Sequence, residues 1–300
     1  MPSPELQNMV AQLHEEQRKA ADLPRPSWEQ MRMDYQELGK LYPAASEAVQ
    51  TETQLADRYT RCFAPEDADP ARAVLFLHGG GYTIGGIITH QAITSRLALA
   101  AGCTVYALDY RLAPEHPFPA AVDDAADAFR ELVKRGLDAS KIAVAGDSAG
   151  GGLTFACALA LRDAGDALPG CLVAISPWND LVGDTGWATC DGSIDPVVTA
   201  AMLHRMTDDY MAGGDARTPH ASPLHADLKG LPPTLIQVGT AEILLTDAKL
   251  MAEKAKNAGV DLTLEIEDGA PHVWHHFAPA VPESVAAINR AGTFIHQHTG

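Results

Sequence analysis

The chain lacks the cysteine pattern, the apolar runs and the targeting signals that several classes of protein need. Its five cysteines are odd in number and widely spaced, and they form no Cys-x-x-Cys pair, so a disulfide framework and a zinc or redox motif are excluded. The longest apolar run, near residues 153–161, is too short to span a bilayer. The first residues lack the basic start and the unbroken apolar core of a secretory signal. We therefore expect a soluble, cytoplasmic protein with no membrane partner.

Positive charge is also scarce. The chain has 22 lysines and arginines against 39 aspartates and glutamates, which gives a formal net charge of -17 at pH 7. Such a surface repels polyphosphate, so we expect no nucleic-acid partner. The apolar fraction of 46% and the charged fraction of 20% are ordinary for a folded chain and exclude general disorder. A length of 300 residues suits one elaborated α/β domain.

Short apolar runs bounded by Gly, Pro or Asp alternate with segments of helical length along most of the chain. The strand candidates are residues 57–63, 73–78, 104–110, 141–146, 171–176, 234–239 and 262–267. The helix candidates among them are residues 90–101, 119–135, 149–164, 246–258 and 282–297. This alternation predicts an α/β fold with a mostly parallel central sheet covered by helices on both faces.

Two regions break the alternation. Residues 1–45 carry apolar side chains at helical spacing on both sides of a Pro-Arg-Pro breaker, and residues 180–217 contain no strand candidate. We predict that residues 1–45 and 180–217 form a helical cap over the carboxyl edge of the sheet. Residues 46–179 and 218–300 would then form the α/β domain beneath it.

A Gly-x-Ser-x-Gly pattern at residues 146–150 lies between a strand candidate and a helix candidate. Glycines two residues to either side allow a sharp turn that holds Ser148 in a strained conformation while neighbouring backbone passes close by. The pattern by itself also arises by chance, but its place between a strand and a helix favours a nucleophilic serine.

A second glycine-rich segment, His78-Gly79-Gly80-Gly81-Tyr82, follows an earlier strand candidate. Neither glycine-rich segment has the spacing of a phosphate-binding loop, so the sequence supports no nucleotide site. Acyl transfer would explain these glycines, because residues without side chains leave their backbone N–H groups accessible, and such groups stabilise the oxyanion of the tetrahedral intermediate. We predict Gly80, Gly81 and Ala149 as the donors, with a plain flexible turn at residues 78–82 as the alternative.

The histidine comes last in the hydrolase order Ser, acid, His, and His272 lies in a loop after the strand candidate 262–267. It is the best placed of the 12 histidines to act as general base. Glu242, the first carboxylate after the strand candidate 234–239, is the predicted acid. Asp247 is the weaker candidate, expected in the next helix as a surface or capping carboxylate.

His272, His275 and His276 share the i, i+3, i+4 spacing that can bind a metal on a helix. The chain has no His-Glu-x-x-His motif, and Val273 and Trp274 between the histidines indicate packing. We therefore predict no metal.

Seven blocks resemble, in order, those of the bacterial members of the hormone-sensitive-lipase-like family of α/β-hydrolases. They are HGGGY at 78–82, YRLAPEHPFPAAVDD at 110–124, GDSAGG at 146–151, SPWNDL at 176–181, SPL at 222–224, GLPPTLIQVGTAEILLTDA at 230–248 and HVWHHF at 272–277. The similarity runs from about residue 60 to the end. It departs from the family at Glu242, where many relatives have Asp, and at Gly85-Gly86, where they often have Gly-Ser.

The resemblance implies an α/β-hydrolase fold with a helical cap and the triad Ser148, Glu242 and His272. It also implies a serine esterase of the short-chain carboxylesterase or ε-lactone hydrolase type, which needs no cofactor and acts on a small ester or lactone. An amidase with the same groups, and a ligand-binding protein on the same scaffold, stay open as alternatives. A homodimer through residues 262–267 is expected, because this segment would be a sheet edge and relatives often pair there.

Two further expectations concern side chains around this site. Tyr82, Trp187, Met206 and Tyr210 are predicted to contact the substrate. Asp147, beside the nucleophile, is expected to play a structural part by pairing near Arg111 or Glu115.

Overall fold

The structure is a computed structural model, which describes residues 1–20, 23–190 and 193–300. In these residues an eight-stranded sheet has the order β1-β2-β4-β3-β5-β6-β7-β8. The strands are β1 (Val49–Leu55), β2 (Arg58–Ala64), β3 (Asp69–Leu77), β4 (Cys103–Leu108), β5 (Ile142–Asp147), β6 (Cys171–Ile175), β7 (Thr234–Ala241) and β8 (Leu262–Pro271). Strands β3 to β8 pair in parallel, while β2 runs antiparallel to β1 and β4.

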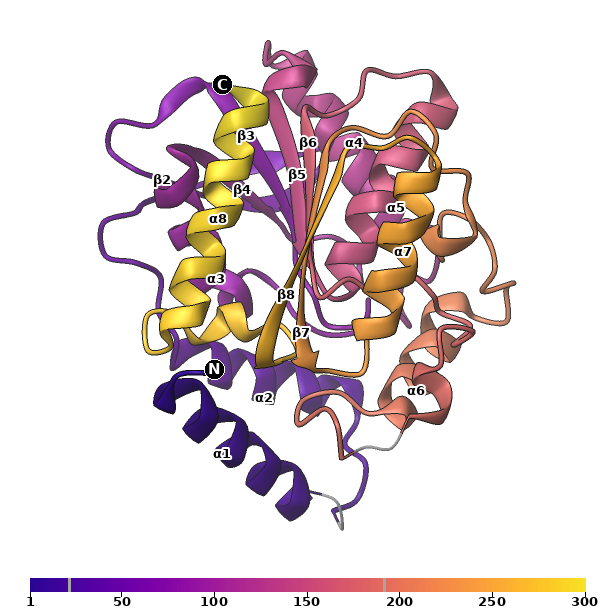
Figure 1. Ribbon diagram of the computed structural model, residues 1–300. Coiled ribbons are helices and arrows are strands. Elements are labelled where there is room, and N and C mark those ends of the chain that lie inside the picture. Colours follow the sequence, from indigo (N-terminus) through magenta and orange to yellow (C-terminus); the bar gives the residue numbers. More distant parts are fainter. Residues whose placement is uncertain (21–22, 191–192) are drawn as a thin grey trace.

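Helices cover both faces of the sheet. They are α1 (Pro4–Ala20), α2 (Trp28–Lys40), α3 (Ile87–Ala101), α4 (Ala120–Lys134), α5 (Ala149–Ala164), α6 (Ala200–Met211), α7 (Leu245–Asn257) and α8 (Pro282–Thr299). Helices α3 and α8 lie on one face, and α4, α5 and α7 lie on the other (Figure 1). Each face has its own apolar cluster, with Phe129 and Phe155 in one and Ile93 and Ile295 in the other. The predicted parallel sheet with helices on both faces is confirmed.

The central strands β5 and β6 are buried at every residue. A strand covered on both faces has no solvent side, so it appears in the sequence as an uninterrupted apolar run. Both strands could be predicted from the sequence for this reason. Strand β1 was not predicted, because its residues Val-Gln-Thr-Glu-Thr-Gln-Leu are mostly exposed at the sheet edge and carry no apolar pattern.

Helices α1, α2 and α6 gather at the end of the molecule where β7 and β8 finish (Figure 1). They belong to the segments 1–45 and 180–217, of which residues 21–22 and 191–192 lie outside the described residues. The two segments touch: the Trp28 indole donates to Asp209 Oδ2 at 2.7 Å, and the Arg205 guanidinium lies 3.8 Å from the centre of the Trp28 ring. No helix in the described residues is long and apolar enough to cross a membrane.

Helices α3 and α8 approach closely at Gly292, where a Cβ atom would lie 2.5 Å from the Ala100 Cβ and 2.6 Å from the Ala100 carbonyl carbon. Gly292→Val should therefore lower the free energy of unfolding by about 1–3 kcal/mol, because the packed backbone cannot yield without strain. Urea denaturation measures the loss. Ala286→Val, at an exposed position of the same helix, is the control and should change stability far less. Equal stabilities for the two variants would contradict the close contact.

Candidate active site

Ser148 occupies a sharp turn between β5 and α5. Its φ of 54° and ψ of -121° lie outside the regions that a side chain with Cβ prefers. The flanking glycines explain how the turn forms: a Cβ on Gly146 would lie 2.3 Å from the Gly150 carbonyl oxygen, and one on Gly150 would lie 2.0 Å from the Leu77 carbonyl oxygen. The Ser148 N–H donates to the Ile175 carbonyl at 2.8 Å, which ties the turn to β6.

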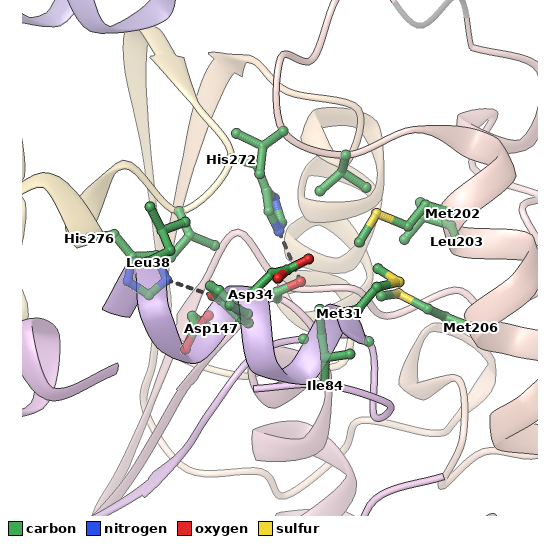
Figure 2. Close-up of a pocket in the computed structure, with 17 residues that line it drawn as sticks. Met31, Asp34, Leu38, Ile84, Asp147, Met202, Leu203, Met206, His272 and His276 are labelled. Atoms are coloured by element: carbon green, nitrogen blue, oxygen red, sulfur yellow. Dashed lines mark hydrogen bonds between the residues drawn. The ribbon is translucent and has the colours of Figure 1, made fainter. Parts of the chain in front are cut away.

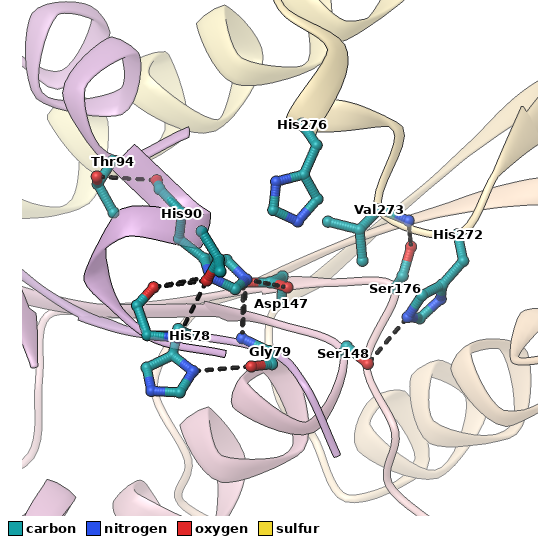
Figure 3. Close-up of polar contacts among 12 residues, drawn as sticks. His78, Gly79, His90, Thr94, Asp147, Ser148, Ser176, His272, Val273 and His276 are labelled. Atoms are coloured by element: carbon teal, nitrogen blue, oxygen red, sulfur yellow. Dashed lines mark hydrogen bonds and ion pairs between the residues drawn. The ribbon is translucent and has the colours of Figure 1, made fainter. Parts of the chain in front are cut away.

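A chain of hydrogen bonds runs from this serine to a buried carboxylate. His272 Nε2 lies 2.9 Å from Ser148 Oγ (Figure 3), and His272 Nδ1 lies 2.8 Å from Glu242 Oε2. The second Glu242 oxygen accepts from the Ser176 hydroxyl at 2.9 Å and from the Gly239 N–H. Because both oxygens of Glu242 are bonded, the carboxylate has one orientation, and it points at His272.

The electrostatics of the pair favour a histidine that can gain a proton. Burial lowers the pKa of His272, but the hydrogen bond and the charge of Glu242 outweigh this and leave that pKa above its ordinary value. The neighbouring imidazoles behave differently, since burial lowers the pKa of His275 and of His276 to about 3. Of these three histidines, His272 is the one with a carboxylate as hydrogen-bond partner.

Asp247 does not take part in this chain. It lies in α7 and is buried, and its Oδ2 accepts from the N–H groups of Asn179 and Asp180 at 3.1 Å each. Burial and the nearby Asp180 carboxylate raise the pKa of Asp247 to about 8. The expectation of a surface or helix-capping carboxylate is wrong: Asp247 anchors the loop after β6 instead.

The glycine-rich segment after β3 lies beside Ser148. Gly80 and Gly81 have φ of 111° and 59°, which side chains rarely adopt. A Cβ on Gly80 would lie 2.3 Å from the Ile84 carbonyl oxygen, and one on Gly81 would lie 1.9 Å from the Met206 sulfur. Ala149 is the first residue of α5, where an N–H has no partner within its own helix.

A cavity of about 360 Å³ opens above Ser148 (Figure 2). The segment 1–45 contributes Met31, Asp34, Tyr35 and Leu38, and the segment 180–217 contributes Val197, Val198, Met202, Leu203 and Met206. The remaining lining consists of Gly80, Gly81, Ile84, Asp147, Ser148, His272, Val273 and His276. The walls are mostly apolar, so the cavity suits a small molecule with an apolar part next to the serine.

Of the four residues predicted to contact substrate, Met206 lines this cavity, whereas Tyr82, Trp187 and Tyr210 lie outside its lining. The Tyr82 and Tyr210 rings stack on each other with centroids 3.9 Å apart, and Trp187 packs against Trp178. All three predicted aromatics are at most 1% exposed. They form the packing behind the cavity rather than its surface. Met31 and Tyr35 of α2 also line the cavity, and they were not among the predicted substrate contacts.

Asp147 makes other contacts than those expected. Arg111 pairs with Asp124 at 2.7 Å and Glu115 pairs with Arg32 at 2.7 Å. Asp147 instead accepts from the Gly79 N–H at 3.1 Å and lies 3.1 Å from His90 Nε2 (Figure 3). It therefore fixes the start of the glycine-rich segment.

Asp147 also belongs to the one group in the described residues whose spacing could hold a metal ion. In this group, His90, Asp147 and His276, the ligand atoms lie within 4.8 Å of one another. His90 and Asp147 bond directly to each other, and His276 contacts the Tyr35 hydroxyl at 3.3 Å. His275, from the histidine set considered in the sequence, bonds to Gln237 at 2.9 Å instead.

Known proteins are similar to this chain in sequence and in fold. The family described as the alpha/beta hydrolase fold matches residues 74–276. An acetyl-hydrolase of Streptomyces hygroscopicus is 46% identical over 229 residues, which cover 76% of this chain and 77% of that protein. An esterase of Acinetobacter venetianus is 34% identical over 226 residues, which cover 74% of this chain and 73% of that protein.

Solved structures agree with these relatives. A crystal structure of an esterase from the bacterial hormone-sensitive lipase family has a TM-score of 0.94 and 41% identity, with 100% of both chains covered. A crystal structure of EstE5 that was soaked by p-nitrophenyl butyrate has a TM-score of 0.93 and 37% identity, with 99% of both chains covered. The chain is thus a carboxylic ester hydrolase and belongs to the bacterial hormone-sensitive-lipase-like family of α/β-hydrolases.

Proposed function

We propose that this hydrolase uses Ser148 as nucleophile, His272 as general base and Glu242 as the acid that orients His272. The observation that carries the proposal is the chain of hydrogen bonds from Ser148 through His272 to Glu242 at the floor of an apolar cavity. As Ser148 Oγ attacks the ester carbonyl carbon, its proton passes to His272 Nε2. Glu242 stabilises the imidazolium that forms.

The N–H groups of Gly80, Gly81 and Ala149 then stabilise the oxyanion of the tetrahedral intermediate. When this intermediate collapses, the alcohol leaves with the proton from His272 and an acyl group stays on Ser148. Water adds by the same route in reverse and releases the carboxylic acid. No step needs a metal or an organic cofactor, and a lactone would react in the same way with its alcohol still attached to the acyl chain.

The proposed substrate is an ester or lactone with a short to medium acyl group. The segments 1–45 and 180–217 act as a cap in this proposal, because both contribute apolar side chains to the cavity wall and they contact each other through Trp28. The butyrate ester used with the structurally similar EstE5 is of the same class. We place the enzyme in the cytoplasm.

Removal of the nucleophile tests the proposed function directly. Ser148→Ala should remove turnover of p-nitrophenyl butyrate, because no other hydroxyl lies within hydrogen-bond distance of His272 Nε2 in the described residues. Turnover that survives this change would overturn the assignment of the nucleophile.

The amide analogue of p-nitrophenyl butyrate tests the amidase alternative. Faster cleavage of this amide than of the ester by the unmodified protein would favour an amidase.

The two carboxylates near the site should respond differently to loss of charge. Glu242→Gln should lower kcat by several orders of magnitude with the fold intact, since an amide can neither stabilise the imidazolium nor hold its tautomer. Asp247→Asn should cost far less, because Asp247 touches backbone N–H groups and not His272. Steady-state kinetics on one ester decide between them, and a larger loss in Asp247→Asn would refute the assignment of the acid.

Acyl chain length tests the enclosed pocket. Each methylene that finds apolar surface adds about 0.8 kcal/mol of binding, so kcat/KM should climb from acetate until the cavity is full. We expect an optimum near butyrate to hexanoate and little activity on emulsified long-chain triglyceride. A series of p-nitrophenyl esters from acetate to palmitate measures the trend. Rates that keep rising to palmitate, with activation at an emulsion surface, would instead indicate a lipase.

We also propose a homodimer that pairs through β8. This strand lies at the end of the sheet, and Ile266 on it is 43% exposed. An exposed apolar edge strand with unpaired backbone groups is a natural place for a second copy to bind. Light scattering at micromolar concentration should give twice the chain mass, and Ile266→Lys should shift the protein toward monomer. A monomeric unmodified protein would exclude this dimer.

A further inference from the structure

Another carboxylate, that of Asp195, lies close to the proposed triad, in the stretch of chain that precedes α6. Asp195 is 1% exposed, although it belongs to the segment 180–217 and not to the sheet. Burial of a carboxylate costs free energy unless hydrogen bonds compensate for it, so its partners indicate why it is there.

Within the described residues, the hydrogen bonds of the Asp195 carboxylate come from backbone N–H donors. Its Oδ1 accepts from Val197 at 2.8 Å and from Val198 at 3.0 Å. Its Oδ2 accepts from Ile243 at 2.9 Å, across 48 residues of sequence. The Asp195 main-chain carbonyl accepts from the Gln17 side chain of α1 at 2.8 Å. Both oxygens of the Asp195 carboxyl group thus act as hydrogen-bond acceptors.

The three backbone partners of the carboxylate lie at the active site. Val197 and Val198 line the cavity above Ser148, and Ile243 is the residue after Glu242. If Asp195 served its own turn alone, the bonds of Oδ1 to the two valines would suffice. The bond from Oδ2 to Ile243 adds a link from the cavity wall to the loop that carries the acid.

Four charged or titratable groups influence His272 at this point: the carboxylates of Glu242, Asp195 and Asp147 and the imidazole of His276. Burial lowers the pKa of His272, the hydrogen bond and charge of Glu242 raise it, and the charges of Asp195 and Asp147 act in the same direction as Glu242. Asp195 thus adds negative charge near the imidazole, next to the loop that carries Glu242.

We infer that Asp195 is a positioning residue that joins the wall of the acyl pocket to the loop of the catalytic acid and supports the protonated state of His272 by its charge. The inference rests on the proposed triad. It means that the segment 180–217 contributes to the chemistry through one buried carboxylate, besides enclosing the substrate.

Asp195→Asn tests two effects together: the charge of Asp195 near His272, and the tether, which is the hydrogen bond from the Ile243 N–H to Asp195 Oδ2. The amide keeps one acceptor oxygen but turns an NH₂ group toward a backbone N–H, so the Glu242 loop should shift. We expect kcat on p-nitrophenyl butyrate to fall about ten- to a hundredfold. The acidic limb of kcat/KM should move to lower pH, because His272 without the Asp195 charge loses its proton more easily.

Two further variants separate these effects. Asp184→Asn, in the same segment, removes the same charge from a partly exposed side chain paired with Arg217, and it should leave both the rate and the acidic limb unchanged. Asp195→Glu keeps the charge but alters the reach of the carboxylate, so kcat should fall while the acidic limb stays near its original pH. Circular dichroism checks that each variant is folded.

The outcomes that overturn the inference differ from those that overturn the triad. If Asp195→Asn matches Asp184→Asn in rate and pH profile, the inference is wrong while the triad stands. An unmoved acidic limb with a reduced kcat would leave Asp195 a purely structural role and also refute the inference. If Asp195→Asn does not fold, Asp195→Glu decides: unchanged kcat would refute the tether. Turnover retained by Ser148→Ala would refute the proposed triad itself.

Discussion

The close approach of backbone around Ser148 is the constraint on which the rest of this active site depends. A residue with a Cβ at φ 54° costs of order 1–3 kcal/mol unless the surroundings enforce it. Here the sheet enforces this conformation. The Ser148 N–H donates to the carbonyl of Ile175, the last residue of β6, and the Ser148 carbonyl accepts from the Trp178 N–H in the loop that follows. Gly146 and Gly150 leave no room for side chains between β3 and the turn. The serine hydroxyl consequently points out of the sheet toward His272.

Once the serine is fixed, the choice of base follows from what surrounds each histidine. His272, His275 and His276 lie within five residues of one another, and desolvation acts against the charged form of all three. His272 differs because Glu242 bonds to its Nδ1, whereas His275 faces an amide oxygen and His276 faces a phenol. An imidazole that must hold a proton during acyl transfer needs that carboxylate. Ser176 and Gly239 in turn hold the carboxylate, so contacts from β7 and from the end of β6 orient the acid beside the proposed base.

The features that could be predicted from sequence are those encoded locally. Seven of the eight strands in the described residues were predicted, since buried strands carry apolar runs, and the turn at Ser148 was predicted because steric needs dictate glycines at fixed spacing. Features set by tertiary packing were not accessible. Tyr82 and Tyr210 stack behind the cavity wall, and nothing in their sequence neighbourhood distinguishes that role from contact with a ligand. The bond from the Ile243 N–H to Asp195 spans 48 residues and leaves no local pattern.

The two helical segments are joined to the chemistry through backbone as well as through apolar contact. Arg32 of α2 donates to the carbonyls of Thr83 and Ala113 at 2.8 Å each and pairs with Glu115. Thr83 follows the glycines proposed to bind the oxyanion, so the helix that closes the cavity also holds that loop. An apolar cavity excludes water, and fixed N–H donors stabilise a developing charge more strongly there than in water. Helix α2 thus both lines the cavity and holds the loop that carries the proposed oxyanion donors, so residues far apart in sequence contribute to one small cavity.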